Sequence, residues 1–255
     1  MIRRCTVAAS VATVALATTL APAGAEAPPD GAPDPVIVVA GTGNDQALAE
    51  QNYAPLAKSL AEQGRDPHVF GLPGGGWGEV EGTADAFAAY VDEVLASTGA
   101  ERVDLVGHSQ GGVVARYYVR YLGGDRTVDD LVSLGAPHYG SELASMASVY
   151  GLWDCLGAPT CRQARTGSPF LEALNTPDDT WGDVTYTNVA TTHDQLVVPY
   201  TNAFLRGDGT VNVAVQDQCP DSPVDHVHLG DDPVALDAVG DALAGRPVEL
   251  YCGPG

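Results

Sequence analysis

A serine between two glycines is the residue of this chain whose surroundings best fit a nucleophile. Residues 107–111 read Gly-His-Ser-Gln-Gly, directly after a predicted strand at 103–106 and at the start of a predicted helix at 109–121. A G-x-S-x-G sequence between a strand and a helix is typical of a sharp turn that exposes the serine hydroxyl, and its glycines let neighbouring backbone approach. The helix also points its first N–H groups at developing negative charge. A simple strand–helix turn is the alternative, but in this context we expect Ser109 to be a nucleophile.

A nucleophilic serine needs a general base, and this turn is typical of an order in which the base comes last, after the acid. His226 and His228 lie in the loop before the last predicted helix, so both are candidates. The other histidines fit less well: two precede the serine, one follows a strand and is expected at the rim of a pocket, and one adjoins the candidate acid. They are His68, His108, His138 and His193.

The acid that orients the base is expected on a loop just after a strand end. Asp194 follows the predicted strand 184–189 and meets this condition, while Asp208 and Asp217 on later loops are weaker alternatives. Because the chain has 33 acidic residues, most of them are solvated surface charges. Position, not residue type, therefore favours Asp194.

Two backbone N–H groups are needed to bind the oxyanion that forms when a serine attacks a carbonyl. One is expected from Gln110, the residue after the serine, and the other from the loop that follows the first strand. That loop is Gly41-Thr42-Gly43, in which we choose Thr42. An ordinary glycine turn is the alternative; a phosphate-binding loop fits less well, because no G-x-G-x-x-G spacing follows.

Short β-branched runs alternate with helical spacing along the chain, which predicts an α/β fold whose mostly parallel sheet is covered by helices on both faces. Strands are predicted at 36–40, 68–70, 103–106, 131–134, 184–189 and 211–215, and helices at 51–63, 83–97, 109–121 and 233–243. Residues 139–183 interrupt the alternation, so we expect an insertion over one end of the sheet. Apolar residues at helical spacing in 141–153 either pack on the sheet or cover the site.

The first 25 residues have the pattern of a cleaved signal peptide. Arg3 and Arg4 precede an uncharged run rich in Ala, Val, Leu and Thr, and Ala23-Gly24-Ala25 supplies small residues before a cleavage site. The run is too short and too rich in Ala and Thr for a transmembrane helix. We therefore expect a signal peptide at 1–25, a Pro-rich flexible leader at 26–35, one catalytic domain at 36–255, and secretion.

The cysteines agree with export. Four remain once the signal is removed, Cys155, Cys161, Cys219 and Cys252, and they allow three pairings. Proximity in the sequence favours Cys155 with Cys161, which would pin the insertion, and Cys219 with Cys252. No CxxC pair or cluster of His and Cys is present, so we expect no metal.

Charge excludes some partners. Without residues 1–25 the chain has ten basic and 33 acidic side chains, a formal charge of −23. Such a protein is a poor ligand for nucleic acid and for anionic membranes. We expect a monomer that needs no cofactor and has no integral membrane segment after the signal is cleaved.

These residues, taken in order, resemble the class 2 bacterial lipase family, secreted α/β-hydrolase lipases that include small Bacillus and Streptomyces enzymes. The motifs that carry the resemblance are Gly-His-Ser-Gln-Gly-Gly (107–112), Leu-Gly-Ala-Pro-His-Tyr-Gly-Ser (134–141), Gly-Ser-Pro-Phe-Leu (167–171), Asp194 with Val198-Pro199, and Asp225-His226 with Leu229 and Asp232-Pro233. The resemblance implies the α/β-hydrolase fold and a catalytic triad of Ser109, Asp194 and His226. It places the oxyanion loop at residues 40–42, where many relatives have His-Gly and this chain has Ala-Gly.

The resemblance implies a triacylglycerol lipase or esterase that acts on a lipid or a small ester. Polyester cleavage or acyl transfer is an alternative, because an acyl-enzyme passes its acyl group to any nucleophile that reaches it. A non-catalytic binding domain on a hydrolase fold is an alternative of another class. That alternative would be favoured by loss of the serine or of a late histidine, and both are present.

Overall fold

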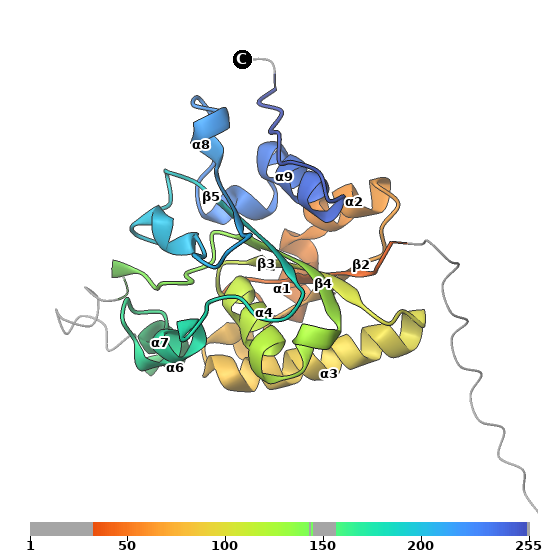
Figure 1. Cartoon of the computed structure of the whole chain (residues 1–255), viewed down its shortest axis with the longest axis vertical. Helices are drawn as coiled ribbons and strands as arrows, with labels where there is room; N and C mark the ends of the chain where they lie inside the picture. The colour runs from red at the N-terminus through yellow and green to blue at the C-terminus, as the bar shows by residue number, and fades with distance from the viewer. Residues whose placement is uncertain (1–32, 143, 145–156, 254–255) are drawn as a thin grey trace, which may run out of the picture.

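A single parallel sheet forms the centre of the computed structural model, which describes residues 33–142, 144 and 157–253 (Figure 1). Its six strands lie in the order β2-β1-β3-β4-β5-β6, and every pair of neighbours is parallel. The strands are β1 (Val36–Val39), β2 (Pro67–Phe70), β3 (Val103–His108), β4 (Val128–Leu134), β5 (Thr185–Ala190) and β6 (Val211–Ala214). The six predicted strands and the parallel α/β architecture are confirmed.

Helices cover both faces of the sheet because both faces of its strands are apolar. Along β1, Val36 and Val38 pack with α1, α2 and α9, whereas Ile37 and Val39 pack with α3, α4 and α7 (Figure 1). The helices are α1 (Gln46–Asn52), α2 (Ala54–Glu62), α3 (Val80–Thr98), α4 (Gln110–Tyr121), α6 (Pro159–Gln163), α7 (Pro169–Asn175), α8 (Val215–Gln218) and α9 (Pro233–Leu243). Short 3₁₀ turns include η1 (Pro73–Gly76) and η5 (Val227–Gly230).

One predicted helix is divided in two. Residues 51–63 were expected to form a single helix, but α1 ends at Asn52 and α2 begins at Ala54. Tyr53 lies between them with φ −98° and ψ 9°, and Pro55 stands in the first turn of α2, where a proline is tolerated. The junction matters for the site because its residue, Tyr53, has its side chain in the interior, where it is 3% exposed.

The insertion at 139–183 is described at its two ends. The Ser141 hydroxyl donates to the Leu196 carbonyl over 2.6 Å, and after the gap α6 and α7 lead the chain back to β5. Neither short helix was predicted. Most of the predicted helix at 141–153 lies outside the described residues.

The disulfide between Cys219 and Cys252 is present, as predicted, with their Cα atoms 5.4 Å apart. Cys155 lies outside the described residues, so its pairing with Cys161 stays a prediction. The proposed signal peptide at 1–25 and most of the leader at 26–35 lie outside them as well. Among the described helices, none is both long and apolar enough to cross a membrane.

Candidate active site

The turn between β3 and α4 holds Ser109 in an unusual backbone conformation. Its φ of 53° and ψ of −123° make it the one non-glycine residue with a positive φ in the part of the chain that the structure describes. The flanking glycines explain how the turn fits: a Cβ on Gly111 would lie 2.2 Å from the Val39 carbonyl oxygen, and one on Gly107 would lie 2.5 Å from the Gly112 Cα. Strain of this kind persists where surrounding packing over-determines the backbone, and it is concentrated at functional sites.

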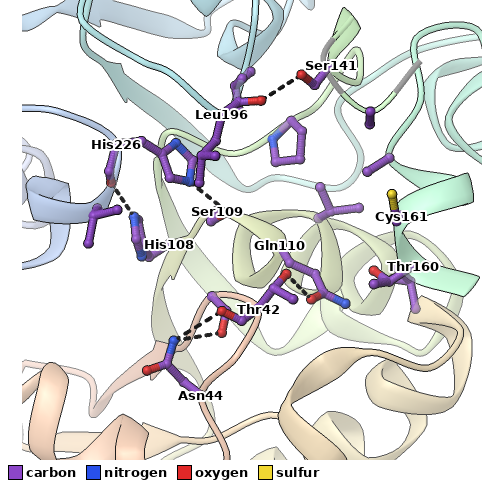
Figure 2. A pocket seen from close by; sticks show the side chains of 18 of the residues that line it. Thr42, Asn44, His108, Ser109, Gln110, Ser141, Thr160, Cys161, Leu196 and His226 are labelled. Atoms are coloured by element: carbon purple, nitrogen blue, oxygen red, sulfur yellow. Dashed lines mark hydrogen bonds between the residues drawn. The ribbon is translucent and has the colours of Figure 1, made fainter. Parts of the chain in front are cut away.

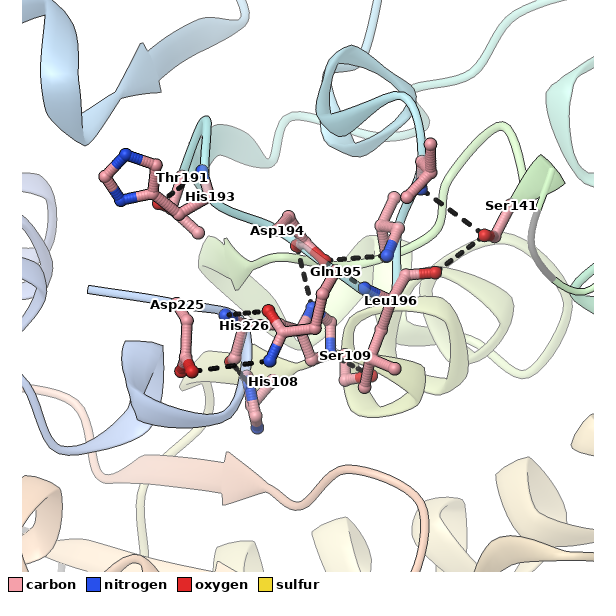
Figure 3. Close-up of polar contacts among 12 residues, drawn as sticks. His108, Ser109, Ser141, Thr191, His193, Asp194, Gln195, Leu196, Asp225 and His226 are labelled. Atoms are coloured by element: carbon pink, nitrogen blue, oxygen red, sulfur yellow. Dashed lines mark hydrogen bonds and ion pairs between the residues drawn. The ribbon is translucent and has the colours of Figure 1, made fainter. Parts of the chain in front are cut away.

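Ser109, His226 and Asp194 come together in a line of hydrogen bonds (Figure 3). The His226 Nε2 lies 2.9 Å from the Ser109 Oγ, and its Nδ1 lies 2.7 Å from the Asp194 Oδ2. The other carboxylate oxygen of Asp194 accepts the backbone N–H groups of Leu196 and Val197, at 2.8 and 2.7 Å. The His226 side chain is 3% exposed and that of Asp194 is 0% exposed. Because both are almost fully buried, the imidazole is held with its Nδ1 toward the carboxylate and its Nε2 toward the Ser109 hydroxyl.

Parallel topology explains why residues so far apart in sequence meet. Ser109 follows β3, Asp194 follows β5, and His226 lies in the loop that leads to η5 and α9. The carboxyl ends of parallel strands share one edge of the sheet, where ligands bind in open α/β folds. Gly135, just after β4, keeps this edge open: its φ is 56°, and a Cβ there would lie 3.1 Å from the His226 Nδ1.

The alternative base and acid lie elsewhere. The exposed His228 ring pairs through its Nδ1 with the Asp225 carboxylate, 2.7 Å away, and this contact raises the pKa of His228 above its usual value. His193 points away from Ser109 (Figure 3). The carboxylate that contacts the buried imidazole of His226 is that of Asp194, not that of Asp208 or Asp217.

The loop after β1 packs directly against the serine. A Cβ on Gly41 would lie 3.2 Å from the Ser109 Cβ, so a larger residue here would press against the serine and require its neighbours to shift. The Thr42 hydroxyl donates to the Gln110 side-chain oxygen over 2.6 Å (Figure 2). The Gln110 side-chain amide in turn donates to the Gly76 carbonyl over 2.9 Å. Gln110 is also the first residue of α4, so its N–H has no carbonyl of the helix to bond. Both predicted oxyanion residues therefore stand beside Ser109.

Sequence reasoning missed two residues that support the site. Tyr53 accepts a hydrogen bond from the Gly41 N–H at 2.8 Å, and its hydroxyl lies 2.7 Å from the Nδ1 of His108, whose Nε2 lies 2.8 Å from the His226 carbonyl oxygen. Burial, reinforced by His226, lowers the pKa of His108 to about 4, and burial raises that of Tyr53 to about 12. His108 was considered only as a possible base; a buried polar ring beside a nucleophile was the available signal.

The expectation that His138 lies at the pocket rim is wrong. The ring is fully buried, with its Nδ1 3.3 Å from the Arg116 guanidinium and its Nε2 3.1 Å from the Asn188 side-chain oxygen. Burial and the adjacent Arg116 lower the pKa of His138 well below its usual value. Arg116 also donates to the carbonyls of Leu174 and Asp179, at 3.3 and 2.7 Å, so this cluster ties α4 to the returning end of the insertion.

Ser109 and His226 line a largely apolar pocket of about 460 Å³ (Figure 2). Helix α4 contributes Val113 to it, and the insertion contributes Thr160, Phe170 and Leu171. Exposed apolar side chains also line it: Trp77, Leu196 and Val227. A cavity of this size and character suits a small apolar ligand or an acyl chain. Within the described residues, no three His, Cys, Asp or Glu side chains form a group that could hold a metal.

Known proteins provide a comparison for this site. Residues 34–154 match the family model described as alpha/beta hydrolase fold. A triacylglycerol lipase of Pseudarthrobacter phenanthrenivorans is 36% identical over 113 residues, 43% of this chain and 35% of the relative. Lipase B of Pseudozyma antarctica is 27% identical over 177 residues, 68% of this chain and 49% of the relative. The chain thus spans about a third to a half of the length of these curated relatives.

Solved structures share the architecture. Lipase B of Aspergillus fumigatus superposes with a TM-score of 0.71 at 20% identity, covering 86% of this chain and 55% of that one. The mature lipase BlEst2 of Bacillus licheniformis gives a TM-score of 0.59 at 22% identity, covering 72% of this chain and 84% of that one. At these identities the likeness establishes the fold alone.

Proposed function

We propose that this chain, which has the α/β-hydrolase fold, is a secreted serine carboxylic-ester hydrolase of the triacylglycerol lipase or esterase type. The observation that carries the proposal is the hydrogen-bonded line from the strained Ser109 through His226 to the buried Asp194. The apolar pocket at the serine supports an acyl substrate, and the lipase relatives support ester hydrolysis. The order of motifs further supports membership of the class 2 bacterial lipase family.

In the proposed first half-reaction, His226 Nε2 takes the proton of the Ser109 hydroxyl while Oγ bonds to the ester carbonyl carbon. The carbonyl oxygen becomes an oxyanion, which the backbone N–H groups of Thr42 and Gln110 bind. The intermediate then breaks its bond to the alkoxy oxygen. That oxygen takes the proton from His226 and leaves as an alcohol, and the acyl group stays on Ser109.

In the second half-reaction, His226 takes a proton from water, whose oxygen attacks the acyl carbon. Breaking the bond to Oγ returns the proton to Ser109 and releases the carboxylic acid. Asp194 keeps the Nδ1 proton of His226 in place throughout, so the Nε2 lone pair faces the serine. It also stabilises the imidazolium that forms in each step.

Export is part of the proposal. We infer a signal peptide at 1–25 and a flexible leader at 26–35, and the disulfide between Cys219 and Cys252 supports an oxidising compartment. N-terminal sequencing of the protein from culture medium should find a start close to Glu26. An intact N-terminus retained in the cell would contradict secretion.

The proposal is tested by replacing the nucleophile and each candidate base. Ser109→Ala and His226→Ala should each lower kcat on p-nitrophenyl esters by roughly 10⁵-fold or more, because members of a triad act as a unit. His228→Ala is the matched control and should be mild, since its ring pairs with Asp225 on the surface. A fluorophosphonate should label Ser109 alone. Labelling elsewhere, or a severe His228 variant with a mild His226 variant, would overturn the assignment.

A further inference from the structure

A buried chain of hydrogen bonds joins the loop after β1 to the loop that carries His226. It runs from the Gly41 N–H through the Tyr53 hydroxyl and the His108 ring to the His226 carbonyl, with links of 2.8, 2.7 and 2.8 Å. Tyr53 and His108 are 3% and 7% exposed. Every link is therefore made away from bulk water, where a polar group that loses its partner cannot bond to solvent instead.

The chemistry of the four groups fixes the direction of the chain. The Gly41 N–H can only donate, so the Tyr53 oxygen accepts that bond and its own proton is left for the His108 Nδ1. His108 then carries its proton on Nε2 and donates it to the His226 carbonyl, which can only accept. One tautomer of His108 satisfies both ends, and the reversed arrangement would leave two acceptors facing each other.

The chain also lies where charge changes during the proposed reaction. The His108 and His226 rings are 5.2 Å apart between centroids, and the Tyr53 ring meets the His108 ring edge-on at 5.8 Å. When His226 becomes an imidazolium, a second cation at that distance would repel it. A hydrogen bond from Tyr53 to the His108 Nδ1 occupies the lone pair that would otherwise take a proton.

We propose that Tyr53 and His108 are positioning residues, which fix the oxyanion loop and the backbone of His226 in their places on either side of Ser109. The inference rests on the proposed function. Tyr53 takes up the Gly41 N–H, which orients the peptide that leads into Thr42, and His108 holds the carbonyl of the residue that acts as the base. Because misplacement of reacting groups by about 1 Å costs on the order of 100-fold in rate, loss of the chain should act on kcat.

Tyr53→Phe removes the hydroxyl and keeps the ring. We expect kcat on a soluble p-nitrophenyl ester to fall about 10- to 100-fold with KM within about twofold of wild type. Tyr118→Phe is the matched control. Tyr118 is also 3% exposed, and its hydroxyl lies 2.7 Å from the Thr127 hydroxyl. It packs on the face of the sheet opposite to Tyr53. That variant should lose similar thermal stability and keep its kcat.

Two substitutions of the second residue complete the test. His108→Gln keeps a side-chain N–H that can reach the His226 carbonyl, whereas His108→Leu keeps none. We expect His108→Gln to retain at least about tenfold more kcat than His108→Leu, a rescue that packing alone would not produce. This pair decides the matter even if Tyr53→Phe does not fold.

The inference fails if Tyr53→Phe keeps wild-type kcat, or if the Gln and Leu variants lose activity equally. It also fails if the fall in kcat follows the fall in melting temperature in every variant. In that case the control Tyr118→Phe would lose kcat as well. Failure of the proposed function looks different: the wild-type protein itself would neither hydrolyse the ester nor react with a fluorophosphonate at Ser109.

Discussion

Acid should destabilise the native protein through His108, and one substitution isolates this effect. Burial, followed by the proximity of the His226 ring, lowers the pKa of His108 from 6.5 to about 4, against smaller opposite influences of the hydrogen bond to the His226 backbone and of Asp194. The neighbouring Tyr53 hydroxyl stays neutral over this range. The unfolded chain therefore takes up a proton at His108 near pH 6.5, while the folded chain does not until about pH 4. Stability is complete above the unfolded value and is lost as the pH falls between the two.

The size of the loss follows from the same two values. A difference of one pKa unit is worth about 1.4 kcal/mol, so the whole window from 6.5 to about 4 amounts to about 3 kcal/mol. Between pH 7 and pH 5, an interval that covers the upper part of that window, the expected loss in the free energy of unfolding is about 2 kcal/mol. For a protein whose total stability is about 5–15 kcal/mol, this is a measurable fraction.

Urea unfolding of the wild type and of His108→Gln at pH 7 and pH 5 measures the effect. Glutamine cannot take the proton, so the variant should lose about 2 kcal/mol less than the wild type over this interval. Carboxylates and the buried His138 are present in both proteins, and their contributions cancel in the difference. Equal losses in the two proteins would refute the reasoning, because they would mean that His108 titrates in the folded state much as it does in the unfolded chain.

Two further predictions concern stability. Replacing Cys219 and Cys252 together by Ala should lower the free energy of unfolding by about 3–4 kcal/mol, since the bridge closes a loop with a sequence separation of 33. Denaturant curves measured with and without reductant check this, and a wild type insensitive to reduction of this bond would contradict it. Gly111→Ala should prevent the turn at Ser109 from forming, because its Cβ would lie 2.2 Å from the Val39 carbonyl oxygen. Circular dichroism should show the loss, whereas Gly82→Ala in α3, where nothing lies within 4 Å, should stabilise by about 0.5–1 kcal/mol.

Local patterns were sufficient to predict the framework of the fold. Asp232 and Pro233 mark the start of α9, whose predicted bounds of 233–243 are confirmed, because capping and proline placement are encoded within a few residues. The division between α1 and α2 was missed, since Tyr53 fits the apolar face of one continuous helix as well as it fits a junction. The short helices α6 and α7 are too brief for periodicity to reveal them.

The candidate site, too, was predictable from the sequence only in part. Ser109 lies in a motif that is readable in five residues. The order of elements along the chain favoured Asp194 as the acid and left His226 and His228 as candidate bases, between which the family resemblance favoured His226. The hydrogen-bond chain through Tyr53, His108 and the His226 carbonyl joins residues 55 and 118 positions apart in sequence, and no pattern along the chain encodes such contacts. The same holds for His138, whose buried position depends on contacts with Arg116 of α4 and Asn188 of β5.

The two attachments of the insertion bear on how this protein could diversify. At one end the Ser141 hydroxyl donates to the Leu196 carbonyl, and at the other end Arg116 of α4 donates to the carbonyls of Leu174 and Asp179. Between these attachments, the pocket-lining residues Thr160 and Phe170 are ones we expect to vary while both anchors keep their partners. Natural variation or a laboratory graft at such positions would then reshape one wall of the pocket without displacing Ser109. In the proposed hydrolase, we therefore expect substrate preference to change through the insertion's share of the pocket lining while the Ser109–His226–Asp194 geometry stays the same.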